Sequence, residues 1–248
     1  MTKITMIGAG NLATHLCRTL KDSGHEIIQV YSRTKKSAYE LSDRINVPYT
    51  TDLESIISSD LAIIAVNDDC IHNIEKHIDF PKVHTSGTKP MSILNGEEIG
   101  VFYPLQTFNK NIEIKFNSIP ICIEASNTEL MQSLTVLAQS ISSKVVKLNS
   151  DQRQRLHLAA VISCNFSNLL YQLSEEICQE EDIPFDILQP LIFETAKKIQ
   201  KTSPSMAQTG PAKRGDSETI EKHIKLLESN IEKEKIYKLL TESIKKRK

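Results

Sequence analysis

Two glycines near the start of the chain have the spacing of a phosphate-binding turn. Gly8, Gly10 and Ala13 follow a short apolar run and open an amphipathic stretch, the context that a G-x-G-x-x-[G/A] pattern requires. The first glycine permits a tight bend, the second lets the backbone approach a pyrophosphate, and the small third residue lets the helix pack closely on the strand. The helix N-terminus then offers free N–H groups to phosphate. The pattern predicts a dinucleotide site formed by Gly8, Gly10, Asn11, Leu12 and Ala13, and the alternative is a turn that merely requires small residues.

The residues after the second apolar run favour one dinucleotide over another. An NAD-binding unit places Asp or Glu about 20 residues after the glycines, where it binds the ribose hydroxyls. This chain has Ser32, Arg33 and Thr34 there instead. A guanidinium and two hydroxyls suit a 2′-phosphate. We therefore predict NADP(H) as the cofactor, and the alternative is that Arg33 is only an exposed loop charge.

Polar residues also follow three later apolar runs, at residues 61–66, 82–84 and 100–103. Ligands of open α/β sheets bind beyond the carboxyl ends of the strands. The residues expected to border the cofactor are Val66, Asn67 and Asp68, and those expected near the substrate are His84, Ser86 and Gln106. Ser86 beside His84 also suggests a hydrolase, but the chain has no nucleophile-elbow pattern around Ser86 and no evident third member of a triad. We predict Ser86 as a catalytic residue that orients the substrate.

A helical pattern at residues 151–180 carries a row of polar side chains. At 100° per residue, an arc of ~120° holds His157, Cys164, Asn165, Asn168 and Tyr171. Their apolar neighbours predict a buried helix, and buried amides and imidazoles need partners. We predict His157 and Asn165 as catalytic residues and Asn168 as a substrate contact. The alternative is that the row pairs with the other domain or with a second subunit.

A segment at residues 203–216 contains two prolines and two glycines and is long for a helix connection. Arg214 within it could bind a carboxylate substrate through two parallel hydrogen bonds.

The elements that position these residues fall into two groups. From residue 3 to about 148, short apolar runs alternate with amphipathic segments, which predicts strands joined by crossover helices. The strands are expected at residues 4–7, 27–31, 61–66, 82–84, 100–103, 119–123 and 144–148. Helical patterns then follow at residues 151–180, 185–202, 217–230 and 233–244. We predict an α/β fold: a Rossmann domain with a doubly wound, mostly parallel sheet at 1–148, and an all-helical C-terminal domain at 149–248.

Composition narrows the class of protein. The formal charge of −1 implies neither a nucleic-acid nor a membrane partner. The five cysteines are scattered and form no C-x-x-C pair, so we expect neither disulfides nor a metal site. No apolar run approaches membrane-spanning length and no secretion signal is recognisable, so a cytoplasmic protein is expected.

The order of these motifs resembles proteins with a Rossmann-like domain and a C-terminal domain of unknown function 2520. The most specific segments are Pro104-Leu105-Gln106-Thr107-Phe108 and Thr209-Gly210-Pro211 followed by Arg214-Gly215-Asp216. Such proteins are similar to pyrroline-5-carboxylate reductase, to β-hydroxyacid dehydrogenases with their 6-phosphogluconate dehydrogenase-like C-terminal domain, and to deazaflavin-dependent NADP oxidoreductases. The resemblance implies a helical dimerisation domain, hence a homodimer, and a cleft between the domains. The dehydrogenases use a lysine on a helix as acid and base, but residues 151–180 contain no lysine.

The resulting hypothesis is an NADPH-dependent reductase of a small C=O or C=N substrate in the interdomain cleft. His157 would protonate the product, because imidazole titrates near neutral pH. The rival hypothesis is a non-enzymatic NADP(H)-binding or regulatory protein whose polar row serves dimer packing.

Overall fold

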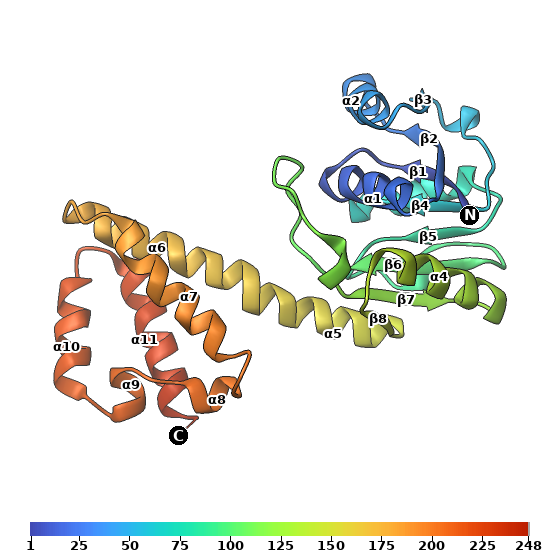
Figure 1. The fold of residues 1–248 in the computed structure, drawn as a ribbon. Helices are drawn as coiled ribbons and strands as arrows, with labels where there is room; N and C mark the ends of the chain where they lie inside the picture. The colour runs from blue at the N-terminus through green and yellow to red at the C-terminus, as the bar shows by residue number, and fades with distance from the viewer. Residues whose placement is uncertain (248) are drawn as a thin grey trace. The chain divides into compact units, whose positions relative to one another are not determined.

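The computed structural model describes residues 1–247, which form two compact units, Met1–Ile162 and the chain from Ser163 onward. The first is an α/β unit and the second is helical, so the predicted fold class is confirmed (Figure 1). The compact units divide 14 residues later than the predicted domains, 1–148 and 149–248, because the helix that follows residue 149 packs with the sheet. The domain ranges stay a prediction.

The first unit is built on one eight-stranded sheet in the order β3-β2-β1-β4-β5-β6-β7-β8. Its strands are β1 (Lys3–Ile7), β2 (Glu26–Tyr31), β3 (Tyr49–Thr50), β4 (Leu61–Ile64), β5 (Lys82–His84), β6 (Ile99–Pro104), β7 (Ile121–Ala125) and β8 (Val145–Lys147). All neighbouring strands are parallel except β6 and β7. The order reverses between β1 and β4, and such a reversal places a crevice at the carboxyl ends of the strands.

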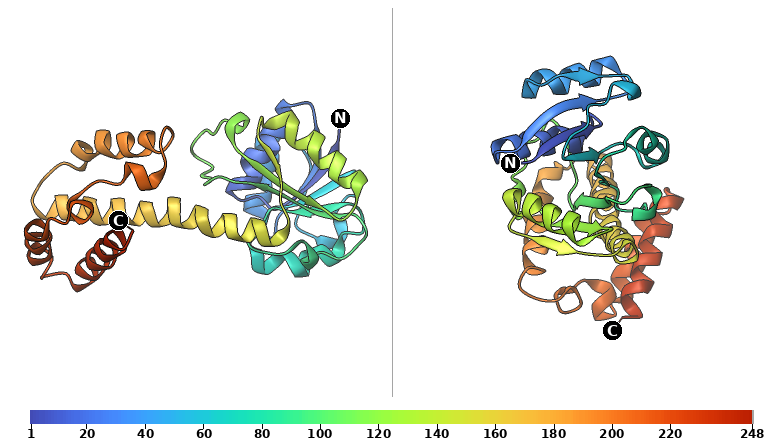
Figure 2. Two further views of the ribbon diagram at one scale, coloured as in Figure 1. Left: turned by 90° about the horizontal axis from the view of Figure 1, so that it is seen from below. Right: turned by 90° about the vertical axis from the view of Figure 1, so that its right-hand side faces the viewer.

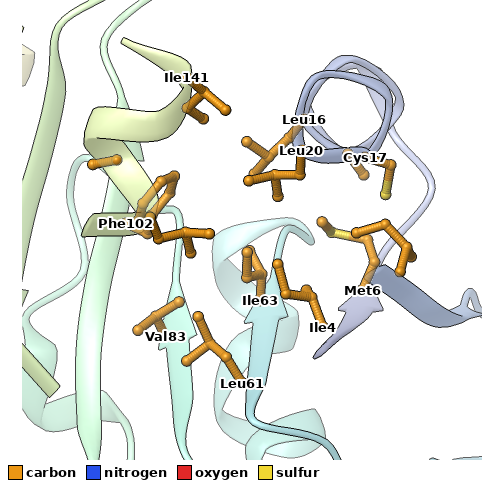
Figure 3. Packing of buried hydrophobic residues seen from close by; sticks show 14 of the residues in the cluster. Ile4, Met6, Leu16, Cys17, Leu20, Leu61, Ile63, Val83, Phe102 and Ile141 are labelled. Atoms are coloured by element: carbon orange, nitrogen blue, oxygen red, sulfur yellow. The ribbon is translucent and has the colours of Figure 1, made fainter. Parts of the chain in front are cut away.

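Helices cover both faces of this sheet (Figure 2). They are α1 (Asn11–Asp22), α2 (Lys35–Ile45), α3 (Ile71–Ile74), α4 (Thr128–Ile141) and α5 (Ser150–Ala160), with 3₁₀ turns at Leu53–Ser55, Asp68–Cys70, Glu75–His77, Met91–Ile93 and Phe116–Ser118. Side chains alternate between the faces along each strand. Ile4 and Met6 therefore pack with Leu16 and Leu20 of α1 in one core (Figure 3), whereas Ile7 belongs to the core on the opposite face.

The second unit contains α6 (Ser167–Glu180), a 3₁₀ turn (Phe185–Leu188), α7 (Gln189–Lys198), α8 (Pro204–Ala207), α9 (Pro211–Arg214), α10 (Ser217–Leu226) and α11 (Ile231–Lys245). Lys233 on α11 is buried and forms ion pairs with Glu176 at 3.3 Å and Glu180 at 2.7 Å, which ties α11 to α6. Among the described residues of this unit, the buried apolar side chains are those of Cys178, Ala212 and Ile220. Few apolar side chains are therefore buried in this unit, although its helices carry many that are exposed.

Three local features differ from the sequence expectations. The short strand β3 was not predicted, because two residues are too few to show the alternation of apolar and polar side chains that marks a strand. The segment 203–216 is not an irregular loop, because prolines at the first helical positions start α8 and α9. The helix predicted for residues 151–180 is interrupted by a π-helical segment, Val161–Phe166, which separates α5 from α6.

Within residues 1–247, no helix is both long and apolar enough to cross a membrane. The same residues contain no group of three His, Cys, Asp or Glu side chains arranged to hold a metal ion.

Candidate functional site

A pocket of about 510 Å³ lies where β1, β2 and β4 end. Several predicted cofactor residues line it, namely Gly8, Gly10, Ser32, Arg33, Thr34, Val66 and Asn67. Tyr31, Ser37, Leu53, Cys70 and Asn73 also line it, and these residues were not predicted. The pocket therefore brings together three loops that are widely separated in the sequence.

The two glycines of the first loop have different surroundings. Gly8 has a φ of +119°, and a Cβ there would lie 2.1 Å from the carbonyl oxygen of Ala65. Gly8 is therefore required by the fold itself. Gly10 has an ordinary φ of −83°, and a Cβ there would meet no atom within 4 Å. The backbone at Gly10 thus borders open space at the start of α1, where the first N–H groups of a helix have no partner within the helix.

The loop after β2 brings one cation to the pocket. Arg33 is exposed and forms no ion pair with the described residues, whereas Ser32 is buried. The helix α2 starts directly after Thr34, and the Thr34 side chain does not cap it. Instead, the Thr34 hydroxyl donates to the Ser37 hydroxyl at 2.9 Å. The uncapped helix start and Arg33 both favour an anion here.

The remaining predicted cofactor residues lie outside the pocket lining. Ala13 is fully buried, where a small side chain lets α1 pack on the sheet, and Leu12 packs against the same core. The Asn11 side chain accepts a hydrogen bond from the Lys110 backbone N–H at 3.3 Å. Asp68 accepts hydrogen bonds from the Ser86 hydroxyl at 2.8 Å and from Thr88. Asp68 therefore joins the ends of β4 and β5.

Ser86 lies in the loop after β5, and its hydroxyl is fully engaged there. It donates to Asp68 and accepts from the backbone N–H groups of Thr88 at 3.1 Å and Lys89 at 2.9 Å. A hydroxyl has one donor and two acceptor positions, so no capacity remains for a substrate while this loop keeps its conformation. The predicted orienting role of Ser86 stays a prediction.

His84 is buried at the end of β5 and is held at both ring nitrogens. Its Nδ1 accepts from the Ser86 backbone N–H at 3.1 Å, and its Nε2 lies 3.3 Å from the Pro90 carbonyl oxygen. Burial lowers the pKa of His84 to about 4, and the positive charge of Arg153 contributes a smaller part of this effect. His84 is therefore a neutral side chain that shapes the loop.

His157 on α5 meets the same loop. Its Nδ1 lies 3.0 Å from the Tyr103 hydroxyl, and the two rings meet edge to face with centroids 6.1 Å apart. A Cβ at Gly87 would lie 2.5 Å from His157 Nδ1 and 3.0 Å from the Tyr103 ring. The imidazole therefore lies over Gly87 at the carboxyl-end edge of the sheet, the edge that also carries the nucleotide pocket.

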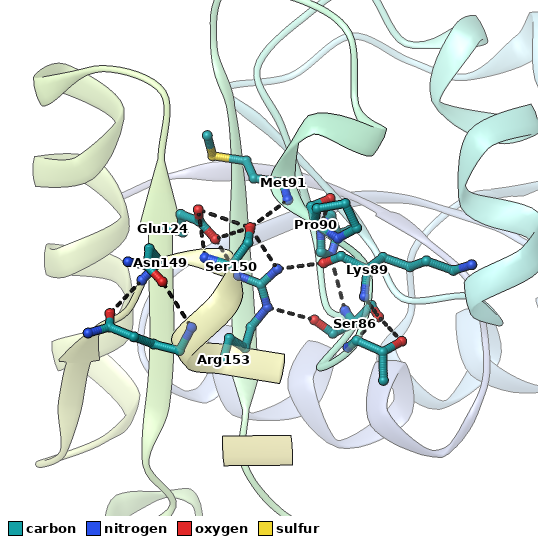
Figure 4. A network of polar contacts seen from close by, with 11 residues as sticks. Ser86, Lys89, Pro90, Met91, Glu124, Asn149, Ser150 and Arg153 are labelled. Carbon is teal, nitrogen blue, oxygen red and sulfur yellow. Dashed lines mark hydrogen bonds and ion pairs between the residues drawn. The ribbon is translucent and has the colours of Figure 1, made fainter. Parts of the chain in front are cut away.

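Arg153, one turn before His157, is a site residue that the sequence analysis missed. Its side chain is 1% exposed, and it forms an ion pair with Glu124 of β7. It also donates to the carbonyl oxygens of Ser86 and Lys89 (Figure 4). Arg153 thus fixes α5 to the loop after β5. A signal existed in principle, because an arginine four residues before His157 lies on the same helix face.

The predicted row of polar side chains is not continuous. A π-helix bonds residue i to i+5, so spacing by 100° per residue fails across Val161–Phe166. The helix is also not buried as expected, since Leu158 and Ile162 are more than half exposed in the first unit. Asn165 and Asn168 are exposed residues of the second unit, and Asn168 lines a groove beside α6 and α7.

Two further predicted substrate residues are engaged locally. The Gln106 side chain accepts from the Thr107 backbone N–H at 2.8 Å. Arg214, in the second unit, is exposed and lies 3.8 Å from Asp216, which caps α10. Each side chain therefore has a partner within its own loop.

Comparison with known proteins places the chain in a family. Residues 119–244 match the domain of unknown function DUF2520, and residues 3–85 match the family described as NADP oxidoreductase coenzyme F420-dependent. This chain belongs to the DUF2520 family. The resemblance inferred from the sequence motifs is thereby confirmed.

Solved structures agree with this assignment. A Bacteroides fragilis protein provisionally assigned as an NADP oxidoreductase is 42% identical, with a TM-score of 0.91, over 99% of this chain and 98% of that one. A 1-pyrroline-5-carboxylate reductase from Streptococcus pyogenes is 14% identical, with a TM-score of 0.66 and coverage of 99% and 98%. An imine reductase from Myxococcus stipitatus in complex with NADP+ is 12% identical, with a TM-score of 0.66 and coverage of 98% and 92%. The last two share the fold. A comparison with curated proteins gave no match.

In this DUF2520 protein, each of the two matched segments contributes residues to the candidate site. The segment 3–85 contains the loops of the nucleotide pocket, and the segment 119–244 contains Glu124, Arg153 and His157. Tyr103 and the loop at Gly87 lie between the two segments and connect them through their contacts with His157.

Proposed function

We propose that this protein is an NADP(H)-dependent oxidoreductase that reduces a small C=O or C=N substrate. The matched family and the similar structures point to an NADP-dependent oxidoreductase. One observation carries the proposal. The same edge of the sheet holds the pocket lined by Gly10 and Arg33 and also His157, which packs on the loop at Gly87.

The pocket residues fit the cofactor. A Cβ on Gly10 would occupy free space, so the backbone there is accessible to a pyrophosphate. Arg33, Thr34 and the uncapped start of α2 would bind the 2′-phosphate through charge-assisted hydrogen bonds. When bound, NADPH would supply a hydride to the substrate carbon and leave as NADP+.

The protein itself would supply the proton. Reduction of C=O or C=N adds hydride to carbon and a proton to oxygen or nitrogen, which yields an alcohol or an amine. His157 is proposed to donate that proton as an imidazolium, which leaves a neutral imidazole behind. Asn165 is kept as a proposed catalytic residue that orients the substrate. Asn168 is kept as a proposed substrate contact, and Arg214 as a proposed contact for a substrate carboxylate.

Cofactor binding is tested first, by titrating the full-length protein with NADPH and with NADH. Loss of one charge-assisted contact costs about 1.5–3 kcal/mol, so Arg33→Ala should weaken NADPH binding roughly ten- to a hundredfold and leave NADH binding nearly unchanged. Arg44→Ala is the matched control, because Arg44 is also exposed but lies outside this pocket. Equal NADPH affinity in both variants would contradict the assignment of Arg33.

Activity is tested with a panel of small carbonyl and imine compounds, followed by NADPH oxidation. His157→Gln should lower turnover by at least about a hundredfold while NADPH affinity stays the same, the size expected for a general acid. Tight NADPH binding without turnover on any compound would favour the rival proposal, a non-enzymatic NADP(H)-binding or regulatory protein.

We also propose that the second unit forms a homodimer with a second copy. The large apolar side chains that it leaves exposed include Phe166, Ile187, Leu191, Phe193, Met206, Leu226, Ile231 and Leu239. A soluble chain rarely leaves so many exposed beside so few buried ones. A second copy would offer the same apolar surface, and matching patches are the usual basis of a twofold dimer.

A further inference from the structure

The contact between Tyr103 and His157 determines which nitrogen of the imidazole is available. The Tyr103 hydroxyl lies 3.0 Å from Nδ1. No described residue forms a hydrogen bond with Nε2 of the same ring. Nε2 is therefore the ring nitrogen left for a substrate.

A tyrosine hydroxyl has one proton to donate, and burial raises the pKa of Tyr103 to about 12, so that proton is present at neutral pH. Among the described residues, Nδ1 of His157 is the hydrogen-bond partner of that hydroxyl, and it accepts the proton in one neutral tautomer and donates its own in the other. A neutral imidazole that accepts at Nδ1 must carry its own proton on Nε2.

We propose that Tyr103 is a positioning residue that holds neutral His157 in the tautomer with the proton on Nε2 and reserves that nitrogen for the substrate. The proposal rests on the proposed reductase function only in naming a substrate as the partner of Nε2. The tautomer itself is a property of the protein without any ligand.

Packing restricts the imidazole in the same orientation. Gly87 lies so close that a Cβ there would come within 2.5 Å of Nδ1 and 2.8 Å of Cγ. Arg153, one turn earlier on α5, donates to the carbonyl oxygens of Ser86 and Lys89 on either side of this glycine. The imidazole ring is thus confined between the loop at Gly87 and the Tyr103 side chain. These contacts keep Nδ1 beside the Tyr103 hydroxyl.

The hydroxyl suits both charge states of His157. A hydroxyl donates to Nδ1 when the imidazole is neutral, and it can accept from Nδ1–H when His157 gains a second proton. The contact can therefore persist when the second proton is added at Nδ1. The imidazolium can then pass its Nε2 proton to the substrate, which leaves one proton on Nδ1, where the Tyr103 oxygen accepts it. A carboxylate in the same position could only accept, and it would favour the opposite tautomer.

The charged and titratable groups around the pair come from four elements. Besides burial, the charges of Cys122 of β7 and Asp68 after β4 raise the pKa of Tyr103, and the charge of Arg153 of α5 lowers it. His84 at the end of β5 stays neutral, because burial lowers its pKa to about 4. A pH titration of the pair must therefore be compared with a variant that alters only the hydroxyl.

Imidazole ¹H–¹⁵N NMR spectra of the full-length protein test the proposal, because the nitrogen shifts distinguish the two neutral tautomers. The spectra are recorded without ligand, roughly two pH units above the usual histidine pKa of about 6.5. The variant His157→Gln identifies the signal of His157 among the seven histidines. The test variant is Tyr103→Phe, which keeps the ring contact and removes only the hydroxyl.

A second tyrosine–histidine pair provides a matched control. The Tyr237 hydroxyl lies 2.8 Å from Nδ1 of His223 in the second unit, also with the rings edge to face. Tyr237→Phe should change the tautomer signal of His223 and leave that of His157 as it is. This control separates loss of one hydrogen bond from a general effect of removing a hydroxyl.

We expect a single Nε2–H tautomer for His157 in the wild type and a mixture of both tautomers in Tyr103→Phe. A mixture or the Nδ1–H tautomer in the wild type, or an unchanged Nε2–H tautomer in Tyr103→Phe, would overturn the proposal. Because the wild-type spectrum alone can overturn it, a variant that fails to fold does not remove the test. Where turnover is found, Tyr103→Phe should lower kcat at least about tenfold, shift its pH profile and leave the NADPH affinity unchanged. Failure to find turnover would contradict the reductase function and not the tautomer.

Discussion

Gly8 and Gly10 belong to one turn, yet the structure gives them different tasks. Gly8→Ala should destabilise the protein by about 2 kcal/mol or more, because its Cβ would meet the Ala65 carbonyl oxygen and its φ is +119°. Gly10→Ala should leave stability nearly unchanged but weaken NADPH binding, because its Cβ would project into free space beside the pocket. Urea unfolding and NADPH titration of both variants check this. An equal loss of stability in both would contradict it.

His84 should make folding stability depend on pH. Burial lowers its pKa in the folded protein to about 4, whereas the unfolded chain has the usual value near 6.5. Below pH 6.5 the unfolded chain therefore binds a proton that the folded protein does not. The free energy of unfolding should fall by about 3 kcal/mol as the pH drops from 6.5 to 4.

The matched variant for this pH effect is His84→Gln, which can still accept one hydrogen bond and donate another but does not titrate. Urea unfolding between pH 4 and 7.5 should give a shallower pH dependence for this variant than for the wild type. Identical slopes would show that other groups cause the effect.

At the scale of elements, the buried guanidinium of Arg153 on α5 links β7 to the loop after β5, beside Ser150, which bonds to Glu124 and to the Met91 backbone N–H. Arg153→Leu should destabilise the protein by about 3–5 kcal/mol, because it leaves the Glu124 carboxylate and two carbonyl oxygens without their partner. Arg155→Leu, on an exposed position of the same helix, should change stability by less than about 0.5 kcal/mol. Urea unfolding compares the two variants. Similar losses would mean that helix propensity, and not the network, is responsible.

The sequence predicted most elements of the sheet because each buried strand is a short apolar run. It did not predict the antiparallel pairing of β6 with β7, which depends on how the chain returns across the sheet. The π-helical segment was also missed, since periodicity analysis assumes 3.6 residues per turn throughout. Within a π-helical turn that assumption fails, so spacing alone no longer places Asn165 and Asn168 on the helix face of His157.

At the scale of the whole molecule, the second unit should be stable only as part of a dimer. The wild type is expected to sediment as a dimer at micromolar concentration. Leu191→Glu with Phe193→Glu should give a monomer with a lower Tm, because these side chains are 63% and 69% exposed and lie on opposite sides of α7.

Analytical ultracentrifugation and thermal unfolding measure this outcome. Val136→Glu is the control, since Val136 is 66% exposed on α4 of the first unit and should leave the dimer intact. A monomeric wild type would contradict the proposed homodimer.

The sequence by itself determined the order of the longer strands and helices, the glycine turn, and the absence of an acid where NAD-binding proteins carry one. These properties depend on residues that are near one another in the chain, so spacing and periodicity suffice to detect them. Only the tertiary structure decided that Asp68 and Ser86 bond to each other and that Arg153 is buried against Glu124. Tyr103 and His157 are 54 residues apart, and it is the parallel sheet that aligns the loop after β5 with the end of β6 beneath α5. The free nitrogen of His157 follows from that alignment, because the contact with Nδ1 depends on three elements meeting at one edge.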